Sequence, residues 1–162
     1  VRRVGSRNVG AANVLRSTGV GRALLVSVLD VAKGAAAVLV AYVSTGGIGV
    51  AALTGAAAVV GHIYPVWLRF HGGKGVAVAA GVFAMLTPIA TVIATTLFLV
   101  TVATTRYVSL GSVAATLALP PAAWLTGAPV AVVASAAGTS ALILFRHRAN
   151  LQRLSDGTER KI

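Results

Sequence analysis

The residues with the clearest chemical potential lie in the stretch GHIYPVWLRFHGGKG, at positions 61–75. This stretch holds two of the chain's three histidines, and Gly72, Gly73 and Gly75 surround Lys74. Glycines let successive backbone N–H groups turn toward one point, where an anion fits. The apolar helix expected after Gly75 would add the partial positive charge of its N-terminus. The pattern favours a phosphate site, although a plain glycine-rich loop with a solvated lysine has the same sequence.

The stretch is not a nucleotide-binding P-loop, because it lacks that motif's glycine spacing and the Ser or Thr after the lysine. The chain contains no cysteine, which excludes disulfides and cysteine-ligated metals. Its acidic residues and histidines show no metal-ligand spacing. We therefore expect a site that works without a metal or another cofactor.

Composition indicates which elements position these residues. Apolar residues make up 57% of the 162 residues and charged residues 10%, whereas soluble domains carry about 25% charged residues. We therefore expect a single membrane-embedded domain over residues 1–162. The net charge of +11 suits contact with anionic lipids or phosphorylated substrates. So few charges among so many apolar runs exclude a nucleic-acid-binding protein.

The apolar segments predict an all-α integral membrane protein with about six short transmembrane helices. These helices are expected at residues 23–43, 48–64, 76–86, 89–104, 110–125 and 130–145. Thr87 and Pro88 separate two of them, because the residue before a proline is disfavoured in a helix. Pro120 and Pro121 are expected to bend the next helix or end it early.

The distribution of charge predicts the orientation of these helices. Alternating helices would bring to one side the polar segments 1–22, 65–75, 106–109 and 146–162. Every Lys and Arg except Lys33 falls in this set. The opposite side receives no basic residue and comprises segments 44–47, 87–88 and 126–129. By the positive-inside rule, the basic side faces the cytoplasm.

The same layout brings polar residues from distant parts of the sequence to one membrane face. The set comprises Ser6, Asn8, Asn13, Arg16, His62, Lys74, Ser109, His147 and Asn150. Only Asp156 and Glu159 add nearby carboxylates, and no Ser-His-Asp constellation can be assigned. Positive charges and hydrogen-bond donors in this mixture suit a reaction of anionic, phosphorylated substrates at the membrane surface.

Three further ionisable residues lie within or beside the predicted spans. Asp30 and Lys33 are three residues apart, which predicts an ion pair on one helix face. Ionisable residues inside a membrane are paired or functional. His62, near a helix end, either packs against protein or contacts substrate. Glu159 is expected to pair with a basic residue.

Five sequence blocks together resemble a known family. They read GSRNVGAANVLR at 5–16, VLDVAKG at 28–34, GHIYPVWLRFHGGKGVAV at 61–78, SLGS at 109–112 and HRANLQRLSDGTERKI at 147–162. In this order the blocks resemble those of the bacterial acyl-phosphate:glycerol-3-phosphate acyltransferases. The resemblance implies a seven-helix, multi-pass protein of the bacterial plasma membrane, with its active site facing the cytoplasm. The family's first helix would precede Val1, so the chain is expected to be N-terminally truncated relative to the family.

The resemblance also implies a reaction and its partners. An acyl group would pass from acyl phosphate to a hydroxyl of glycerol 3-phosphate, giving 1-acyl-glycerol 3-phosphate and inorganic phosphate. The acyl chain would lie among membrane lipids. Acyl phosphate is already activated, so neither a covalent enzyme intermediate nor a metal is required.

Roles for individual residues follow from the matched motifs. Arg16 and Lys74 would neutralise substrate phosphate. His147 would orient or deprotonate the glycerol hydroxyl, unless a substrate phosphate acts as the base. Asn150 would share the helix face of His147, and Ser109 would line the acyl-phosphate end. The expected phosphate donors also include Ser6, Asn8, Asn13, Gly72 and Gly73, with His62 and Glu159 as additional candidates.

Four positions depart from the family pattern. They are Arg7 in place of a glycine, Ala12 and Val78 in place of threonines, and His71 in place of a lysine. Each change removes or alters a candidate phosphate contact. A non-catalytic or degenerate membrane relative therefore stays open as an alternative. A small phosphoester or anion transporter also stays open, although such proteins carry inverted repeats and charged residues at mid-membrane.

Overall fold

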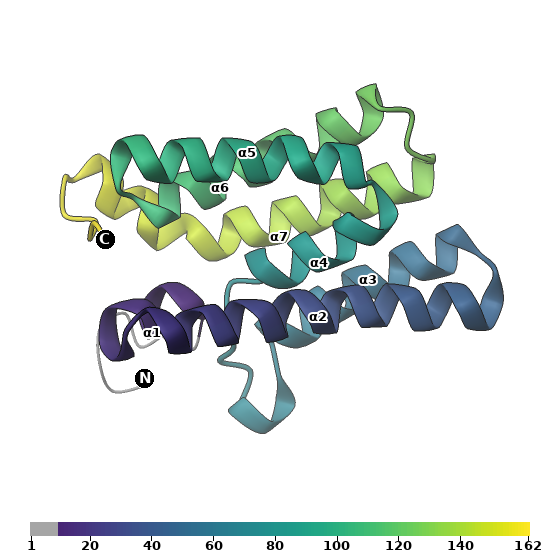
Figure 1. Ribbon diagram of the computed structural model, residues 1–162, viewed down its shortest axis with the longest axis horizontal. Helices are drawn as coiled ribbons and strands as arrows, with labels where there is room; N and C mark the ends of the chain where they lie inside the picture. The colour runs from purple at the N-terminus through teal and green to yellow at the C-terminus, as the bar shows by residue number, and fades with distance from the viewer. Residues whose placement is uncertain (1–9) are drawn as a thin grey trace.

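A computed structural model describes residues 10–162, and all regular elements in this part of the chain are helical (Figure 1). The elements are α1 (Ala11–Thr18), α2 (Val20–Thr45), α3 (Ile48–Ile63), the short 3-10 helix η1 (Val66–Leu68), α4 (Val76–Leu86), α5 (Pro88–Thr105), α6 (Val108–Leu125) and α7 (Val130–Ser155). The predicted all-α membrane class is confirmed.

Five elements are long and apolar enough to cross a membrane, namely α2, α3 together with η1, α5, α6 and α7. Helix α4 has 11 residues, so it is only about 16 Å long, roughly half the thickness of a bilayer's hydrocarbon core. The predicted break between the third and fourth helices is confirmed, since α4 ends at Leu86 and α5 begins at Pro88. Proline suits a first helical position because its missing N–H has no partner there anyway.

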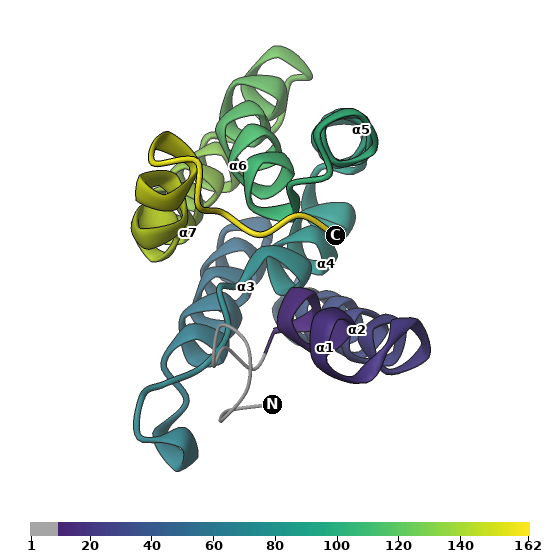
Figure 2. The ribbon, with the colours of Figure 1, turned by 90° about the vertical axis from the view of Figure 1, so that its left-hand side faces the viewer.

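Helix α4 lies between two groups of helices. Helices α1, α2 and α3 are on one side, and α5, α6 and α7 are on the other (Figures 1 and 2). Two glycines allow α2 and α4 to touch through their backbones. A Cβ on Gly34 would lie 2.2 Å from the Val78 carbonyl oxygen, and one on Gly81 would lie 2.0 Å from that of Val31. The contact holds α4 close against α2.

Apolar side chains cover both the inside and the outside of the bundle. Phe83, Val82 and Val59 are fully buried where α3 and α4 meet. Large apolar side chains such as Leu29, Leu53 and others on α2, α3, α5 and α6 are exposed. A surface of this kind is stable when it faces lipid, in agreement with the long apolar helices.

The end of α7 differs from the sequence prediction, whereas the end of α6 agrees with it. Helix α7 continues to Ser155 rather than ending near 145, because charged residues end an apolar run without ending a helix. Helix α6 ends at Leu125, as predicted, and runs through Pro120 and Pro121. Prolines are tolerated in membrane helices, where neighbouring groups satisfy the freed carbonyls. The extension of α7 places His147 and Asn150 on a regular helix.

Candidate active site

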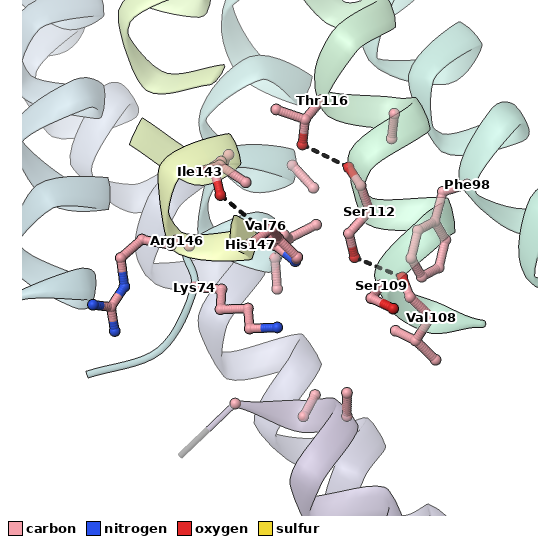
Figure 3. A pocket seen from close by; sticks show the side chains of 18 of the residues that line it. Lys74, Val76, Phe98, Val108, Ser109, Ser112, Thr116, Ile143, Arg146 and His147 are labelled. Carbon is pink, nitrogen blue, oxygen red and sulfur yellow. Dashed lines mark hydrogen bonds between the residues drawn. The ribbon is translucent and has the colours of Figure 1, made fainter. Parts of the chain in front are cut away.

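A cavity of about 690 Å³ lies at the junction of all seven α-helices of the described chain and the C-terminal tail (Figure 3). One part of its wall is polar and basic, with Asn13, Arg16, Lys74, Arg146, His147, Asn150 and Glu159. Another part is apolar, with Phe83, Ala94, Phe98, Leu99, Leu119 and Ile143. A cavity with these two parts suits a ligand that has an anionic head and an apolar chain.

The structure brings most of the predicted site residues together. Asn13, Arg16, His62, Lys74, Ser109, His147, Asn150 and Glu159 all line this single cavity. They come from α1, α3, the loop before α4, α6, α7 and the tail. Ser6 and Asn8, like Arg7, lie outside the described residues. The predicted convergence of separated segments is therefore present for every described candidate except Gly72 and Gly73, which do not line the cavity.

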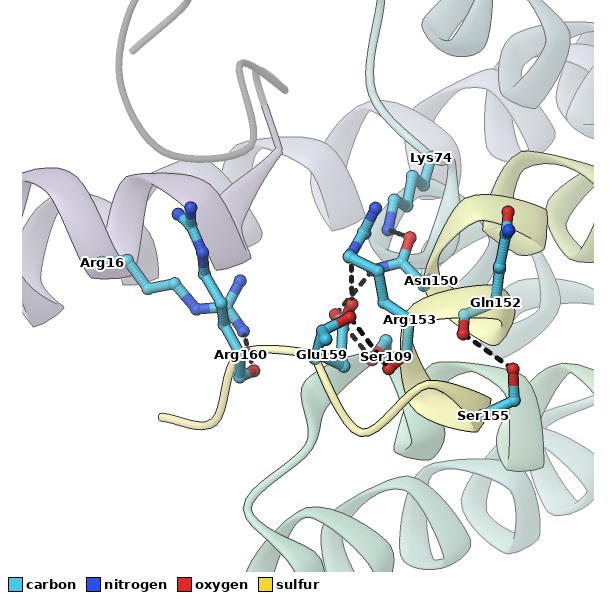
Figure 4. A network of polar contacts seen from close by, with 10 residues as sticks. Arg16, Lys74, Ser109, Asn150, Gln152, Arg153, Ser155, Glu159 and Arg160 are labelled. Atoms are coloured by element: carbon cyan, nitrogen blue, oxygen red, sulfur yellow. Dashed lines mark hydrogen bonds and ion pairs between the residues drawn. The ribbon is translucent and has the colours of Figure 1, made fainter.

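A buried carboxylate joins three of these segments (Figure 4). Oε1 of Glu159 accepts hydrogen bonds from Ser109 Oγ at 3.0 Å and from Asn150 Nδ2 at 2.7 Å. Its Oε2 pairs with Arg153 Nε at 2.7 Å. Burial raises the pKa of Glu159, but the hydrogen bonds from Asn150, Arg153 and Ser109 outweigh that effect, so the pKa is lowered overall. Glu159 is thus an anionic anchor, paired with a basic residue as expected.

Lys74 is held at the edge of this network. Its Nζ donates to Asn150 Oδ1, while the amide nitrogen of Asn150 donates to Glu159. Burial is the main cause that lowers the pKa of Lys74 from 10.5 to about 8, and nearby arginines add to it. Asn150 therefore orients an ammonium group that has lost much of its hydration, which strengthens its attraction for an anion.

His147 has a defined hydrogen-bonding state. The residue is 2% exposed, and its Nδ1 lies 2.8 Å from the carbonyl oxygen of Ile143 one turn earlier in α7 (Figure 3). A carbonyl only accepts, so Nδ1 must donate. Nε2 of the neutral ring is then an acceptor on the wall of the cavity. That arrangement is the one a hydroxyl-activating histidine needs.

Gly72 and Gly73 do not take the role predicted for them. The Gly72 amide donates to the carbonyl of Ile63 at 3.1 Å, and the Gly73 amide donates to the carbonyl of His62 at 3.2 Å. A Cβ on either glycine would lie 2.0 Å from an atom of His62. The two glycines therefore allow close packing against α3, and their amides are already used.

Three arginines of the site were not assigned to it from the sequence. Arg146, Arg153 and Arg160 line the cavity. The Arg160 carbonyl accepts a hydrogen bond of 2.7 Å from Arg16, which joins the tail to α1 (Figure 4). The spacing of Arg153 from Asn150, three residues along the same helix, was the signal that could have placed it here.

The residues that depart from the family pattern lie in different parts of the structure. Val78 is completely buried where α2 and α4 touch and does not line the cavity. His71 is exposed on the loop after η1. Ala12 does line the cavity, so it is the described departure that changes the site itself. Among the described residues, no group of three or more His, Cys, Asp or Glu side chains could hold a metal ion.

Fold and cavity together define a multi-pass membrane protein with a cavity whose lining suits an amphiphilic anion. The family model described as glycerol-3-phosphate acyltransferase matches residues 1–157. The chain belongs to this family.

Individual relatives agree with this assignment. The glycerol-3-phosphate acyltransferase of Synechococcus sp. (strain CC9902) is 44% identical over 162 residues, covering 100% of this chain and 81% of the relative. That of Syntrophotalea carbinolica is 43% identical over 163 residues, covering 99% and 83%. The chain is also 42% identical in sequence to PlsY, an integral membrane glycerol 3-phosphate acyltransferase with known crystal structures. The glycerol 3-phosphate form of PlsY superimposes on this chain with a TM-score of 0.95, covering 99% of this chain and 81% of PlsY. The lysophosphatidic acid form superimposes with a TM-score of 0.92, covering 98% of this chain and 81% of PlsY.

Proposed function

We propose that this chain transfers an acyl group from acyl phosphate to a hydroxyl of glycerol 3-phosphate. The reaction takes place at the cytoplasmic face of a bacterial plasma membrane. The single observation that carries the proposal is the two-part cavity, which joins a buried basic end to an apolar end. Acyl phosphate has a phosphate head and an apolar chain, and glycerol 3-phosphate adds a second anion at the basic end.

Unpartnered donors support the binding of these anions. Arg16 Nε and Arg146 Nε are buried and have no hydrogen-bond partner among the described residues. A buried donor without a partner costs about 1–3 kcal/mol, which a phosphate oxygen would offset. Lys74 supplies a further charge beside them. Guanidinium groups bind phosphate through two parallel hydrogen bonds, and the ammonium acts as a point charge.

The chemical step needs a hydroxyl nucleophile and a route for one proton. The glycerol oxygen forms a bond to the acyl carbon, and the bond from that carbon to the phosphate oxygen breaks. His147 Nε2 accepts the hydrogen bond of the attacking hydroxyl, since Nδ1 is bonded to Ile143. The phosphate leaves with the bonding electron pair, and the hydroxyl proton passes from His147 to it. General base catalysis of this kind contributes about 10²- to 10⁴-fold.

Positioning accounts for much of the remaining acceleration. Hydrogen bonds link Lys74 to Asn150 and Asn150 to Glu159. The ammonium group of Lys74 is therefore held in place before substrate arrives. Two anions held in register convert a bimolecular reaction into an effectively unimolecular one. Ser109 is bonded to the same carboxylate and supports it.

The distribution of basic residues supports the orientation. Arg16, Lys74, Arg153 and Arg160 lie together at the end of the bundle that contains α1 and the C-terminal tail (Figures 1 and 4). Basic residues favour the cytoplasmic side of a membrane. The substrates would then enter from the cytoplasm and from the inner leaflet.

A donor comparison tests the proposal. Purified chain in detergent is given glycerol 3-phosphate with either palmitoyl phosphate or a palmitoyl thioester, and product is identified by mass spectrometry. We expect 1-acyl-glycerol 3-phosphate and equimolar phosphate with acyl phosphate alone, and a rate at least about 10²-fold lower in His147→Ala. Product from the thioester alone would refute the proposed donor. No product from either donor would assign the chain to the non-catalytic alternative.

A further inference from the structure

A second polar cluster lies beside the glycine loop, the segment of residues 72–75 that precedes α4. It consists of Asp30 and Lys33 on α2 and His62 on α3. Lys33 Nζ lies 2.6 Å from Asp30 Oδ1 and 2.6 Å from His62 Nδ1. The side chains of Asp30 and His62 are 13% and 9% exposed, whereas that of Lys33 is 46% exposed. The predicted ion pair between Asp30 and Lys33 is thus present, and His62 contacts Lys33 as the third residue of the cluster.

The ammonium group of Lys33 determines the state of the His62 ring. An ammonium only donates hydrogen bonds, so His62 Nδ1 must accept. The ring proton of the neutral histidine is therefore on Nε2, at the opposite edge. His62 Nδ1 and Asp30 Oδ1 are 3.5 Å apart, but neither atom then carries a proton for the other. Lys33 is the group that joins them.

The Nε2 edge of His62 packs against the loop that carries Lys74. A Cβ on Gly73 would lie 2.0 Å from His62 Nε2, so the ring occupies the space that a side chain there would need. The Gly73 amide donates to the His62 carbonyl, and the Gly72 amide donates to the carbonyl of Ile63. Ring and backbone of α3 therefore hold the two residues immediately before Lys74.

We propose that Asp30, Lys33 and His62 are positioning residues that act on the site through Gly73. They hold the loop so that Lys74 points toward Asn150 and the polar part of the cavity. The cluster also pairs the carboxylate of Asp30, which lines the cavity and would otherwise repel an anionic substrate. The inference rests on the proposed function only for the role of Lys74 in binding substrate.

The first test needs no substrate and measures the position of Lys74 directly. The full chain in detergent is treated with acetic anhydride, and acetylation of Lys74 relative to Lys161 is followed by peptide mass spectrometry. We expect His62→Ala and Lys33→Met to raise this ratio about three- to tenfold, the scale of one lost hydrogen bond. An unchanged ratio in both variants would overturn the proposal.

Matched variants separate positioning from a general loss of structure. His62→Asn keeps an acceptor for Lys33 near the place of Nδ1 but loses the ring edge against Gly73, so it should retain part of the wild-type protection and lie between wild type and His62→Ala. His71→Ala changes the exposed histidine of the same loop and should leave the ratio unchanged. Helix content is compared by circular dichroism, and Lys33→Met decides the question if His62→Ala does not fold.

The second test uses turnover. His62→Ala should raise the KM for a phosphorylated substrate in the wild-type background and have little effect when Lys74→Ala is also present. An equal loss in both backgrounds would refute action through Lys74. A wild-type chain without turnover would refute the proposed function alone, because the acetylation ratio still decides whether the cluster positions Lys74.

Discussion

The charge of Lys74 gives the sharpest prediction about pH. Burial is the largest cause that lowers its pKa from 10.5 to about 8. Glu159 opposes the shift, while Arg153, Arg16 and Arg146 add to it. At about 1.4 kcal/mol per pKa unit, the empty cavity disfavours the charged amine by about 3 kcal/mol. The neutral form of Lys74 therefore becomes dominant above about pH 8, which is accessible to experiment.

The sign of the effect follows from the protonation states. Lys74 is an ammonium below pH 8 and a neutral amine above it. By mass action, about nine-tenths of the molecules carry the charge at pH 7 and about one-tenth at pH 9. Substrate phosphates have a second pKa of about 6, so their charge changes little in this range. The value of kcat/KM reports the free enzyme and should fall about tenfold per pH unit well above pH 8.

The assay is the initial rate of lysophosphatidate formation between pH 6.5 and 9.5, with a blank for spontaneous hydrolysis of acyl phosphate. Lys74→Arg keeps a positive charge throughout, because arginine does not deprotonate in proteins. We expect this variant to be slower but to lose the alkaline decline, and Lys161→Arg to behave as wild type. A flat wild-type profile, or the same decline in Lys74→Arg, would show that the charge of Lys74 does not control substrate binding.

Three further predictions concern the anchor, the helix contact and the apolar part of the cavity. Glu159→Gln loses an ion pair and should lower the free energy of unfolding by about 1–3 kcal/mol, measured by thermal denaturation, with a raised KM for glycerol 3-phosphate. Gly81→Ala places a Cβ 2.0 Å from a carbonyl of α2 and should destabilise by about 1–3 kcal/mol or more. Gly138→Ala meets nothing within 4 Å and should have little effect in the same melts. Leu119→Trp should shift the ratio of kcat/KM values toward shorter acyl chains, whereas the exposed Leu125→Trp should not.

Much of the fold could be predicted because lipid imposes simple rules. Long apolar runs, one proline and the distribution of basic residues were sufficient for the six apolar helices and the break at Thr87–Pro88, but not for the short helices α1 and η1. The end of α7 was missed because hydropathy marks the edge of the apolar run, while the helix continues through charged residues to Ser155. Helix α4 has the predicted bounds of 76–86, and its 11 residues cover only part of the membrane.

The site was predicted at the level of its motifs and not of its contacts. Convergence of Arg16, Lys74 and His147 followed from the layout and is present. The pairing of Glu159 with Arg153, out of several arginines, depends on how the tail folds back over α7. Likewise, the use of the glycine-loop amides depends on the exact approach of α3, which residue spacing alone does not encode.

The most direct test of the account is a structure of this chain with glycerol 3-phosphate and a non-hydrolysable acyl phosphonate. We predict both phosphorus-containing groups at the polar end, within hydrogen-bond distance of Lys74 and the unpartnered donors of Arg16 or Arg146. The acyl chain should lie along Phe98 and Leu119, with the glycerol hydroxyl beside His147 Nε2. Phosphates bound outside the cavity, or an acyl chain that leaves its apolar wall empty, would contradict the account.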